Sequence, residues 1–472
     1  MKKLILHIFV IIFAVSVFAF SVSAATCSLT DKEASEALHE LGLLQGVGTN
    51  ADGSVNFNLK WKLTREQAVT MIVRLLGAES EALNANNPNP FTDVAAWAVP
   101  YVSYAYANGI TKGISATEFD GDGVMKDYEF ITMILRTLGY SDANGDFTWN
   151  APYTLAKEVG ISESSASNSR FNRGNSFIFC YNALTANTKS GESIVEQLVK
   201  KGVFTTEKFE EVKIDRAKLT EGADLRIMSF NILAELWDAK AAETMPVREK
   251  LVPAILQTYK PDVVGVQEVS GSWYYALKTK LADEYAFVSY FTPDGKHNYT
   301  NILYNVNKAE LIEYDTTLYT VKTMDTSHRF TWARFKRLSD GAEYIVTCTH
   351  WHVELDYRKQ QWNENAKMIK ELYEKYKLPI FATGDYNSTE KSFFTDFINA
   401  ASMLDPITES EAVNNAGTTY HDLSVAPKGS DMTLDHIAVA KGPELLYYNR
   451  ITCPTALEAS DHCPIFIDVK LP

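Results

Sequence analysis

The spacing of apolar and polar residues changes near the middle of this chain. Up to about residue 200, apolar positions recur every three or four residues, as in "LTREQAVTMIVRLLG" (63–77), which predicts short amphipathic helices. Beyond residue 223, short apolar runs such as "DVVGVQEV" and "PIFATGDYN" alternate with helical stretches, which predicts sheets covered by helices. We therefore expect an all-α part and an α/β part, joined by a charged linker at 203–222.

The helical part contains an internal repeat. The stretch at 63–77 aligns with "MKDYEFITMILRTLG" (125–139), and a looser third copy, "FNRGNSFIFCYNAL", covers 171–184. A unit of this size cannot bury its apolar face alone, so its copies are expected to pack against each other. The sequence therefore predicts one bundle built from three helical repeats.

The first residues predict export. "MKKLILHIFVIIFAVSVFAFSVSAA" places two lysines before an apolar run that ends in small residues, which predicts a signal peptide at 1–25, cleaved after Ala24 or Ala25. An uncleaved membrane anchor is the alternative, because the apolar run is long enough to span a bilayer. No later segment is apolar enough, so we expect no transmembrane segment after cleavage.

Composition narrows the possible partners and redox chemistry. A chain of 472 residues is expected to form two or three domains. Its five cysteines are too few for a disulfide framework, although Cys453 and Cys463 could pair. The net charge of −14 argues against a surface that coats long polyanions. Residues 221–472 alone carry 25 Lys and Arg against 35 Asp and Glu. A nuclease is not excluded, because a bound cation can offset acidic groups locally.

Polar side chains with metal-binding or proton-transfer chemistry follow the apolar runs of the C-terminal part. They are Asn231, Glu268, His350, Asp385, Asn387, Asp435, Asp461 and His462. Two carboxylates brought to about 4 Å at an effective dielectric near 20 repel by about 4 kcal/mol, so such a cluster needs protons or cations. Oxygen ligands without a thiolate favour Mg²⁺ or Mn²⁺, and neighbouring histidines can transfer protons near neutral pH. This combination suits the hydrolysis of phosphoesters by water.

The same motifs resemble the endonuclease/exonuclease/phosphatase superfamily. The resemblance rests on Asn231, Gln267-Glu268, Thr349-His350, Gly384-Asp385-Tyr386-Asn387, Asp435-x-Ile437 and Ser460-Asp461-His462. It covers residues 223–472 and implies a four-layered α/β sandwich of two packed mixed sheets, with the active site at one end. Leu233 stands where some nucleases of the superfamily carry an Asp, so a ligand from that position is absent.

The resemblance also implies a role for each residue of the set. Asn231, Glu268 and Asp461 are expected to bind Mg²⁺ or Mn²⁺. Asp385 is expected to activate the attacking water, with support from Asn387. We expect His462, oriented by Asp435, to stabilise the phosphoryl oxygens or move a proton. His350 is expected to donate to the phosphate or the leaving group.

The helical part resembles the S-layer homology repeats of bacterial cell surfaces. The resemblance lies in Phe91-Thr92-Asp93-Val94 with Trp97, and in Thr64-Arg65-Glu66, and it covers residues 26–202. It implies a three-fold helical bundle that binds anionic wall polysaccharide, and so attachment to a Gram-positive-type envelope. Arg65, Asp93, Trp97 and Arg173 are the candidate polymer-binding residues. The alternative is a bundle that only spaces the next domain, since the Thr-Arg pair becomes Lys126-Asp127 in the second copy.

The identity of the phosphoester stays open at this point. A secreted phosphodiesterase or nuclease is the first hypothesis, an inositol-phosphate or sphingomyelinase-like lipid phosphoesterase the second, and a non-catalytic wall adhesin the third. Two aromatic stretches bear on the choice, "KTMDTSHRFTWARFKR" (322–337) and "SGSWYYALKTKL" (270–281). Their rings could stack on bases, touch lipid or sugar, or simply belong to the core.

Overall fold

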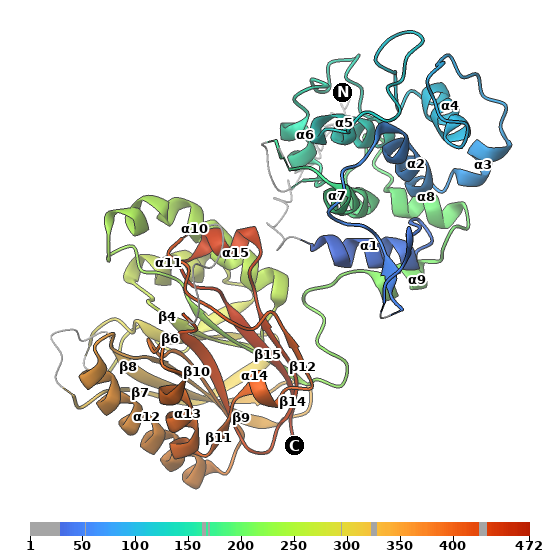
Figure 1. Cartoon of the computed structure of the whole chain (residues 1–472). Coiled ribbons are helices and arrows are strands. Elements are labelled where there is room, and N and C mark those ends of the chain that lie inside the picture. The colour runs from blue at the N-terminus through green and yellow to red at the C-terminus, as the bar shows by residue number, and fades with distance from the viewer. Residues whose placement is uncertain are drawn as a thin grey trace, which may run out of the picture.

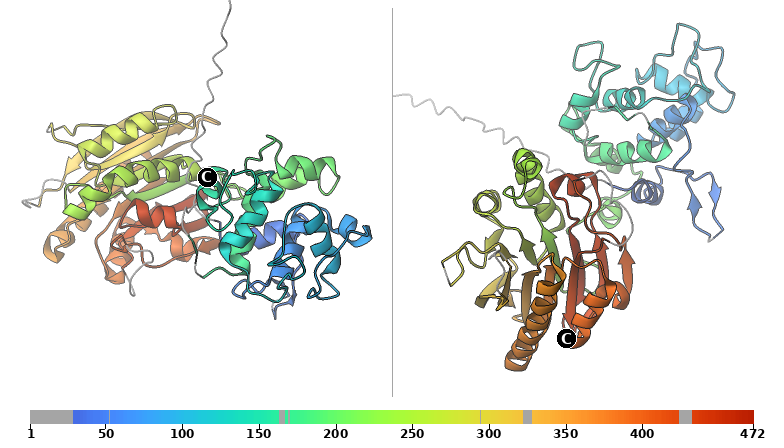
Figure 2. Two further views of the ribbon diagram at one scale, coloured as in Figure 1. Left: turned by 90° about the horizontal axis from the view of Figure 1, so that it is seen from above. Right: turned by 60° about the vertical axis from the view of Figure 1, so that its left-hand side comes forward.

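Figures 1 and 2 show a helical N-terminal body and a sheet-containing C-terminal body. The computed structural model describes residues 29–51, 53–162, 167–168, 170–293, 295–321, 328–423 and 432–472. The predicted signal peptide, residues 1–25, therefore lies outside the described residues. Within the described ranges, the search for a helix long and apolar enough to cross a membrane finds none.

The N-terminal body is built from short helices and one small hairpin. Its elements are α1 Asp31–Glu40, β1 Gly48–Thr49, β2 Val55–Asn56, α2 Arg65–Leu75, α3 Glu79–Asn84, α4 Val99–Ala107, α5 Asp127–Thr137, α6 Tyr153–Glu158, α7 Arg173–Thr185, α8 Ile194–Lys200 and α9 Thr206–Val212. The repeated stretches become α2, α5 and α7. In each of these helices the third side chain accepts the N-cap backbone N–H, which satisfies one donor that the helix start leaves open.

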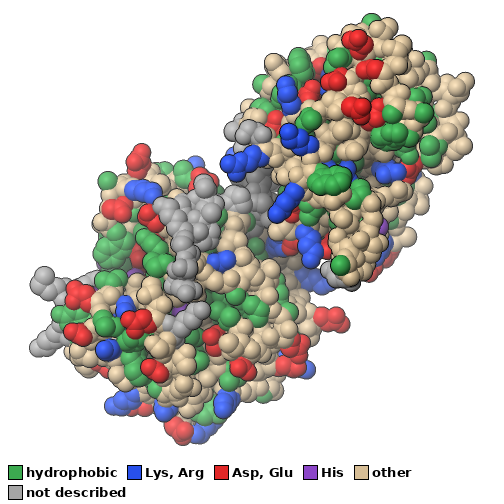
Figure 3. Space-filling model, in the orientation of Figure 1, with side chains coloured by type: hydrophobic (Ala, Val, Ile, Leu, Met, Phe, Trp, Pro, Cys, Tyr) green, Lys and Arg blue, Asp and Glu red, His purple; other side chains and the backbone are tan. Residues whose placement is uncertain are grey.

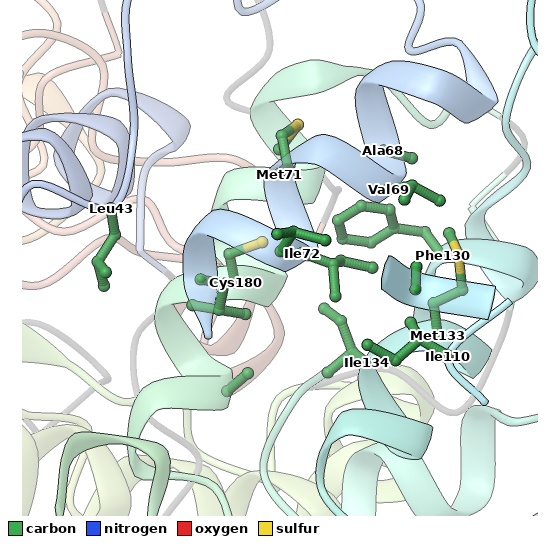
Figure 4. Packing of buried hydrophobic residues seen from close by; sticks show 14 of the residues in the cluster. Leu43, Ala68, Val69, Met71, Ile72, Ile110, Phe130, Met133, Ile134 and Cys180 are labelled. Atoms are coloured by element: carbon green, nitrogen blue, oxygen red, sulfur yellow. The ribbon is translucent and has the colours of Figure 1, made fainter. Parts of the chain in front are cut away.

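One apolar core holds this body together. Ile72 of α2, Phe130 and Ile134 of α5, and Phe177 of α7 are fully buried in a single cluster. Figure 4 shows side chains from these helices pointing toward one another, among them Ile72, Phe130 and Cys180. The repeats thus bury their apolar faces on each other, as the helical spacing predicts.

The predicted linker at 203–222 is only partly a connection. Its first half folds as α9, and Phe209 of α9 is buried in the core of the helical body. Its second half forms hydrogen bonds and an ion pair with both the N-terminal and the C-terminal body. Arg216 forms a two-pronged ion pair with Glu33 of α1, while the backbone oxygens of Arg216 and Lys218 accept hydrogen bonds from Arg226 of the C-terminal body.

The C-terminal body contains two mixed sheets. The six-stranded sheet has the order β11-β13-β10-β9-β8-β7, and the seven-stranded sheet has the order β12-β14-β15-β3-β4-β6-β5. The strands are β3 Leu225–Asn231, β4 Val263–Gln267, β5 Tyr285–Phe287, β6 Thr300–Asn305, β7 Ala309–Leu318, β8 Arg329–Arg337, β9 Glu343–His350, β10 Ile380–Asp385, β11 Met403–Leu404, β12 Ala412–Asn414, β13 Asp435–Ala440, β14 Glu444–Arg450 and β15 Ile465–Lys470.

Helices cover the outer faces of both sheets, which makes four layers. The helices are α10 Ala239–Tyr259, α11 Gly271–Lys280, α12 Leu355–Tyr376, α13 Lys391–Ala401, α14 Pro406–Glu409 and α15 Pro454–Ala459. Apolar side chains of α12 and α13 pack with β9 and β10, those of α10, α11 and α15 pack with β3 and β4, and a third cluster fills the space between the sheets. The predicted α/β sandwich of two packed mixed sheets is confirmed.

Two glycines let the sheets approach closely near the predicted site. A Cβ on Gly265 of β4 would lie 1.7 Å from Oγ1 of Thr383 on β10, across the gap between the sheets. A Cβ on Gly384 would lie 2.6 Å from Cγ2 of Thr349 on the neighbouring β9. Neither position tolerates a side chain, because real contacts of this kind are never so short. The ends of β4 and β10 are therefore held side by side.

Two questions that the sequence leaves open are answered here. Cys463 is a free, buried thiol, so the pairing of Cys453 with Cys463 is not made. The described part of the basic aromatic stretch 322–337 is the strand β8, in which Phe330 and Phe335 are buried in core clusters. Phe330 and Phe335 lie on opposite faces of the strand, one packed with α12 and α13 and the other between the sheets, so both rings belong to the core.

Candidate active site

Strand register brings the predicted polar residues to one edge of the sandwich. Asn231 at the end of β3 pairs with Gln267 at the end of β4. Asp385 at the end of β10 pairs with His350 of β9 on one side and with Asp435 of β13 on the other. Because the two sheets touch at Gly265 and Thr383, these two groups of strand ends face each other.

Asp385 lies at the centre of this arrangement and is 1% exposed. Its Oδ1 accepts the Asn387 N–H at 2.9 Å, and its Oδ2 accepts the Asn231 amide at 3.0 Å. The same Oδ2 lies 3.5 Å from Nε2 of His350 and 3.7 Å from Nε2 of His462. One carboxylate oxygen is thus surrounded by an amide and two imidazoles.

His462 and Asp435 form a buried pair beside it. Nδ1 of His462 lies 2.8 Å from Oδ2 of Asp435, which fixes the imidazole with Nε2 toward Asp385. Burial alone lowers the pKa of His462, but the carboxylates of Asp435, Asp385 and Asp461 outweigh it and raise that pKa well above the ordinary value. The surrounding carboxylates therefore favour the imidazolium form of His462.

His350 has the opposite character. It is buried, and burial lowers the pKa of His350 below its ordinary value, with Asp385 opposing the shift and His328 adding to it. Its neighbours are two more imidazoles: His328 and His350 have ring centroids 5.2 Å apart, and His328 and His352 5.0 Å. The surroundings thus favour the neutral form of His350 and the charged form of His462, one on either side of Asp385.

Glu268 is held by several donors from the segment that follows β3. Asn231 Nδ2 donates to Oε1 at 3.0 Å, and the Ala234 N–H donates to Oε2 at 2.7 Å. The Trp237 indole N–H also donates to Oε2. The backbone of Glu268 has φ +64°, in the left-handed region that is strained for a side chain of this kind, and Asn387 has φ +46°. Both strained residues belong to the cluster.

The charges of the cluster fit a bound cation. Burial raises the pKa of Asp461 to about 6, with Glu268 and Asp385 adding to the shift and His462 opposing it. The polar atoms of Asp385, Asp435 and His462 lie within 4.8 Å of one another, but Nδ1 of His462 is bonded to Asp435 and an imidazolium cannot bind a metal, so the carboxylates are the candidate ligands here. Oxygen donors predominate in this group, which fits a hard divalent cation. Asn231 differs from expectation, because its amide nitrogen faces the carboxylates and its Oδ1 accepts the Leu233 N–H.

Some residues of the site were missed by sequence reasoning. Trp237 contacts Glu268, and Arg248 is fully buried and donates to the backbone oxygens of Ile232 and Leu233, which holds the segment after β3. Tyr420 packs edge-on against His462 at 5.1 Å between ring centroids. The nearest signal in the sequence was the tryptophan of "ILAELWD", an aromatic side chain in a polar segment just after Asn231.

The candidate wall-binding residues occupy different environments. Arg65 is buried and donates to Glu129 and to the Phe119 oxygen, and Arg173 is buried and donates to the Phe57 oxygen. Asp93 accepts two backbone N–H groups at 2.7 Å, and Trp97 is 53% exposed. A hollow of about 500 Å³ between α2 and α5 is lined by Arg65, Lys112, Arg136 and Trp149 among others.

Comparison with known families agrees with both halves of this description. A model described as the Endonuclease/Exonuclease/phosphatase family matches residues 228–462, and a model described as the S-layer homology domain matches residues 90–126. Both resemblances seen in the sequence are confirmed, in the expected order along the chain. The second model matches one repeat, so the three-repeat division remains a prediction.

The curated relatives are each similar to one half of the chain. The middle cell wall protein of Brevibacillus brevis is 29% identical over 175 residues, which is 36% of this chain and 16% of that protein. Nocturnin of Drosophila melanogaster is 25% identical over 192 residues, which is 36% of this chain and 29% of that protein. The chain thus spans less than a third of the length of either relative.

Solved structures are similar to the C-terminal body. An endonuclease/exonuclease/phosphatase from Bacteroides vulgatus is 25% identical, with a TM-score of 0.47, and the match covers 52% of this chain and 99% of that one. A mannosyl-6-phosphatase from Bacteroides thetaiotaomicron is 20% identical, with a TM-score of 0.46 and coverage of 52% and 99%.

Proposed function

We propose that this chain, whose residues 228–462 match the endonuclease/exonuclease/phosphatase family model, is a divalent-cation-dependent phosphoester hydrolase attached to the cell surface. The observation that carries the proposal is the meeting of Asp385, His350 and His462 around one carboxylate oxygen, where the ends of both sheets touch. A phosphodiester is the preferred substrate of this proposal.

Glu268 and Asp461 would hold a Mg²⁺ or Mn²⁺ ion, with Asn231 beside them. Both carboxylates are half-buried, and burial, with a smaller contribution from Glu268 and Asp385, raises the pKa of Asp461, so a bound cation would offset the cost of ionising it. Bound there, the cation would polarise the phosphoryl oxygens and reduce the cost of charge at phosphorus. Asn231 could join through oxygen only after its amide turned over, because its nitrogen now faces Glu268 and Asp385.

Asp385 orients the attacking water and accepts its proton. Its Oδ1 is fixed by the Asn387 N–H, so Oδ2 faces the space between the two imidazoles. Asn387 itself is fixed by a 2.8 Å bond from its amide to the Trp351 oxygen, which keeps the strained turn in place. A base held in one orientation needs no rearrangement when the water attacks.

The two imidazoles have separate tasks because their charges differ. His462, held as an imidazolium by Asp435, stabilises the negative charge that develops on the phosphoryl oxygens or passes a proton to the leaving group. His350, with its pKa lowered by burial, donates a neutral hydrogen bond to the phosphate. Groups whose pKa values are pushed apart in this way suit acid and base roles at one pH.

Two substituted proteins test these roles. We expect the full chain to release p-nitrophenol from bis-(p-nitrophenyl) phosphate in Mg²⁺, and faster than from the monoester. Asp385→Ala and His462→Ala should each lower kcat by about 10²- to 10⁴-fold, the range for loss of a general acid or base. Asp396→Ala, on the exposed side of α13, is the matched control. Activity retained in Asp385→Ala contradicts the assigned roles, and preference for the monoester favours a phosphatase.

Attachment to the wall is the second half of the proposal. It is supported by the S-layer homology match at 90–126, and by the relatives named as cell wall and cell surface proteins. Trp97 is exposed, and the hollow beside Arg65 holds cationic and aromatic side chains, with Glu129 and Asp142 paired to its cations, so an anionic polysaccharide would have to compete with these carboxylates. Pelleting of the full chain with purified cell walls should fall in Trp97→Ala and not in Tyr373→Ala, an exposed position of the sandwich.

A further inference from the structure

The edge of the sandwich next to Glu268 carries a group of aromatic side chains that the proposed hydrolysis does not use. We call this group the aromatic ledge; it consists of Tyr274, Tyr275, Tyr290, Phe291 and His297. Ring centroids are 4.0 Å apart for Tyr274 and Tyr290, and 5.6 Å for Tyr275 and Tyr290. Tyr290 lies 4.4 Å from Phe291 and 4.8 Å from His297. The rings form one continuous surface.

The outer rings of the ledge face solvent. Tyr275 is 59% exposed and Phe291 55% exposed, whereas Trp273 on the same helix is fully buried and donates its N–H to the Leu233 oxygen. Helix α11 thus buries Trp273 in the core and exposes Tyr275 to solvent. Tyr274 and Tyr290 are partly buried behind the exposed rings and support them.

The ledge and Glu268 belong to the same corner of the fold. Ser270, the N-cap of α11, lies two positions after Glu268, and a Cβ on Gly271 would lie 3.4 Å from His297 and 3.8 Å from Tyr290 Oη. The Val269 N–H donates to the Tyr299 oxygen at 3.0 Å, which ties the segment carrying Phe291 and His297 to this turn. The ledge is therefore attached to the turn that directly follows Glu268.

Charge distinguishes the possible occupants of the ledge. Nζ of Lys278 lies 5.7 Å from the ring centroid of Tyr274, and Lys296 is exposed in the segment between Phe291 and His297. Aromatic rings with ammonium groups beside them are the combination that binds single-stranded nucleotides, by stacking on bases and attracting phosphates. Acidic and basic side chains are interspersed over the face of the sandwich shown in Figure 3, so a long polyanion finds no continuous basic band on that face.

We infer that the aromatic ledge stacks the base of a nucleotide whose phosphate lies in the Glu268–Asp385 site. The substrate class is then a nucleoside phosphodiester of one or a few nucleotides. This inference rests on the proposed phosphoester hydrolysis and adds the chemical identity of the group next to the phosphate. Tyr275 and Phe291 are the rings that the base would contact.

Matched diesters test the inference. The full chain in Mg²⁺ is given a dinucleoside monophosphate and its analogue with base-free riboses, and kcat/KM is measured for each. Stacking of one base predicts a preference of about 5- to 100-fold for the base-bearing ester. We expect Tyr275→Ala and Phe291→Ala each to reduce this ratio at least about 5-fold, Tyr275→Phe to retain it, and Tyr373→Ala on α12 to leave it unchanged.

The outcomes separate the ledge from the hydrolysis. Equal kcat/KM for the two esters overturns the ledge inference but leaves the hydrolase proposal intact. Cleavage of a hexose phosphodiester or of sphingomyelin vesicles that is faster than cleavage of the dinucleoside monophosphate has the same meaning. If no ester is cleaved, the hydrolase proposal fails. The ledge inference is then tested separately, by measuring ligand binding with calorimetry. Adenosine 5′-monophosphate should then bind more tightly than ribose 5-phosphate, and lose that advantage in Tyr275→Ala; equal affinities overturn the inference.

Discussion

The raised pKa of Asp461 makes the stability of the protein depend on pH. Its folded pKa of about 6 exceeds the ordinary value of 3.8, so between these values the folded state holds a proton that the unfolded state has released. Stability due to this group is therefore full at low pH and falls as pH rises through about 6, by about 3 kcal/mol in total.

The test is urea unfolding of the parent protein and of Asp461→Asn, both in the presence of a chelator. As pH rises from about 4 to about 7, we expect the free energy of unfolding to fall more in the parent than in the variant. Added Mg²⁺ at neutral pH should restore stability to the parent more than to the variant, because the ion replaces the missing proton. Identical pH dependence in the two proteins would show that the folded protein does not raise the pKa of Asp461.

The pair of Asp435 and His462 makes a second prediction at this scale. Asp435→Asn keeps the shape of the side chain but removes the carboxylate that stabilises the imidazolium. We expect kcat to fall by about 10²-fold or more, and the limb of the pH–rate profile that reports His462 to move to lower pH. A reduced rate with an unmoved profile would assign Asp435 a purely structural role.

Single residues also show what the sequence could and could not predict. The polar residues at the ends of apolar runs were found, because a strand that ends on Asp, Asn or Glu is visible in the sequence alone. Trp237 and Arg248 were not, since their roles depend on how the segment after β3 folds back over Glu268. The orientation of the Asn231 amide depends on two distant acceptors, Glu268 and Asp385, together with the Leu233 N–H, and no local pattern records the distant pair.

At the scale of elements, the start of β3 and the end of the connection that precedes it are fixed by one buried ion pair. Arg226 and Asp468 are 3% and 0% exposed at their side chains, 2.6 Å apart, and Arg226 also donates to three backbone oxygens. Asp468→Ala leaves that guanidinium buried without its partner, so we expect a loss of about 3–5 kcal/mol in the free energy of unfolding.

Urea unfolding measures this loss, and Glu371→Ala is the matched control. Glu371 pairs with Lys367 on the exposed face of α12, and such a surface pair contributes about 0–1 kcal/mol. Equal effects of the two substitutions would mean that water reaches Arg226. The sequence indicated a charged connection but not this pair, because residues 226 and 468 meet only through the pairing of β3 with β15.

At the scale of the whole molecule, the segment after α9 joins the two bodies by specific bonds. Arg216 pairs with Glu33, and the Ile214 N–H donates to Tyr181, while Thr220 donates to Asp468. A charged, weakly periodic segment is typical of a free linker, which is why its bonded state could not be read from its composition. Arg216→Ala should increase the rate of limited proteolysis between 213 and 222 several-fold, without changing kcat on a small diester.

The most direct measurement is the rate of diester hydrolysis by the full chain as Mg²⁺ is titrated, compared between the parent and Glu268→Gln. We predict no turnover in chelator, a saturable rise in the parent, and a curve for Glu268→Gln shifted to at least about 10-fold higher Mg²⁺, because one charged ligand is lost. Hydrolysis that proceeds equally in chelator, or titrations that coincide for the two proteins, would contradict a cation site at the joined ends of the two sheets.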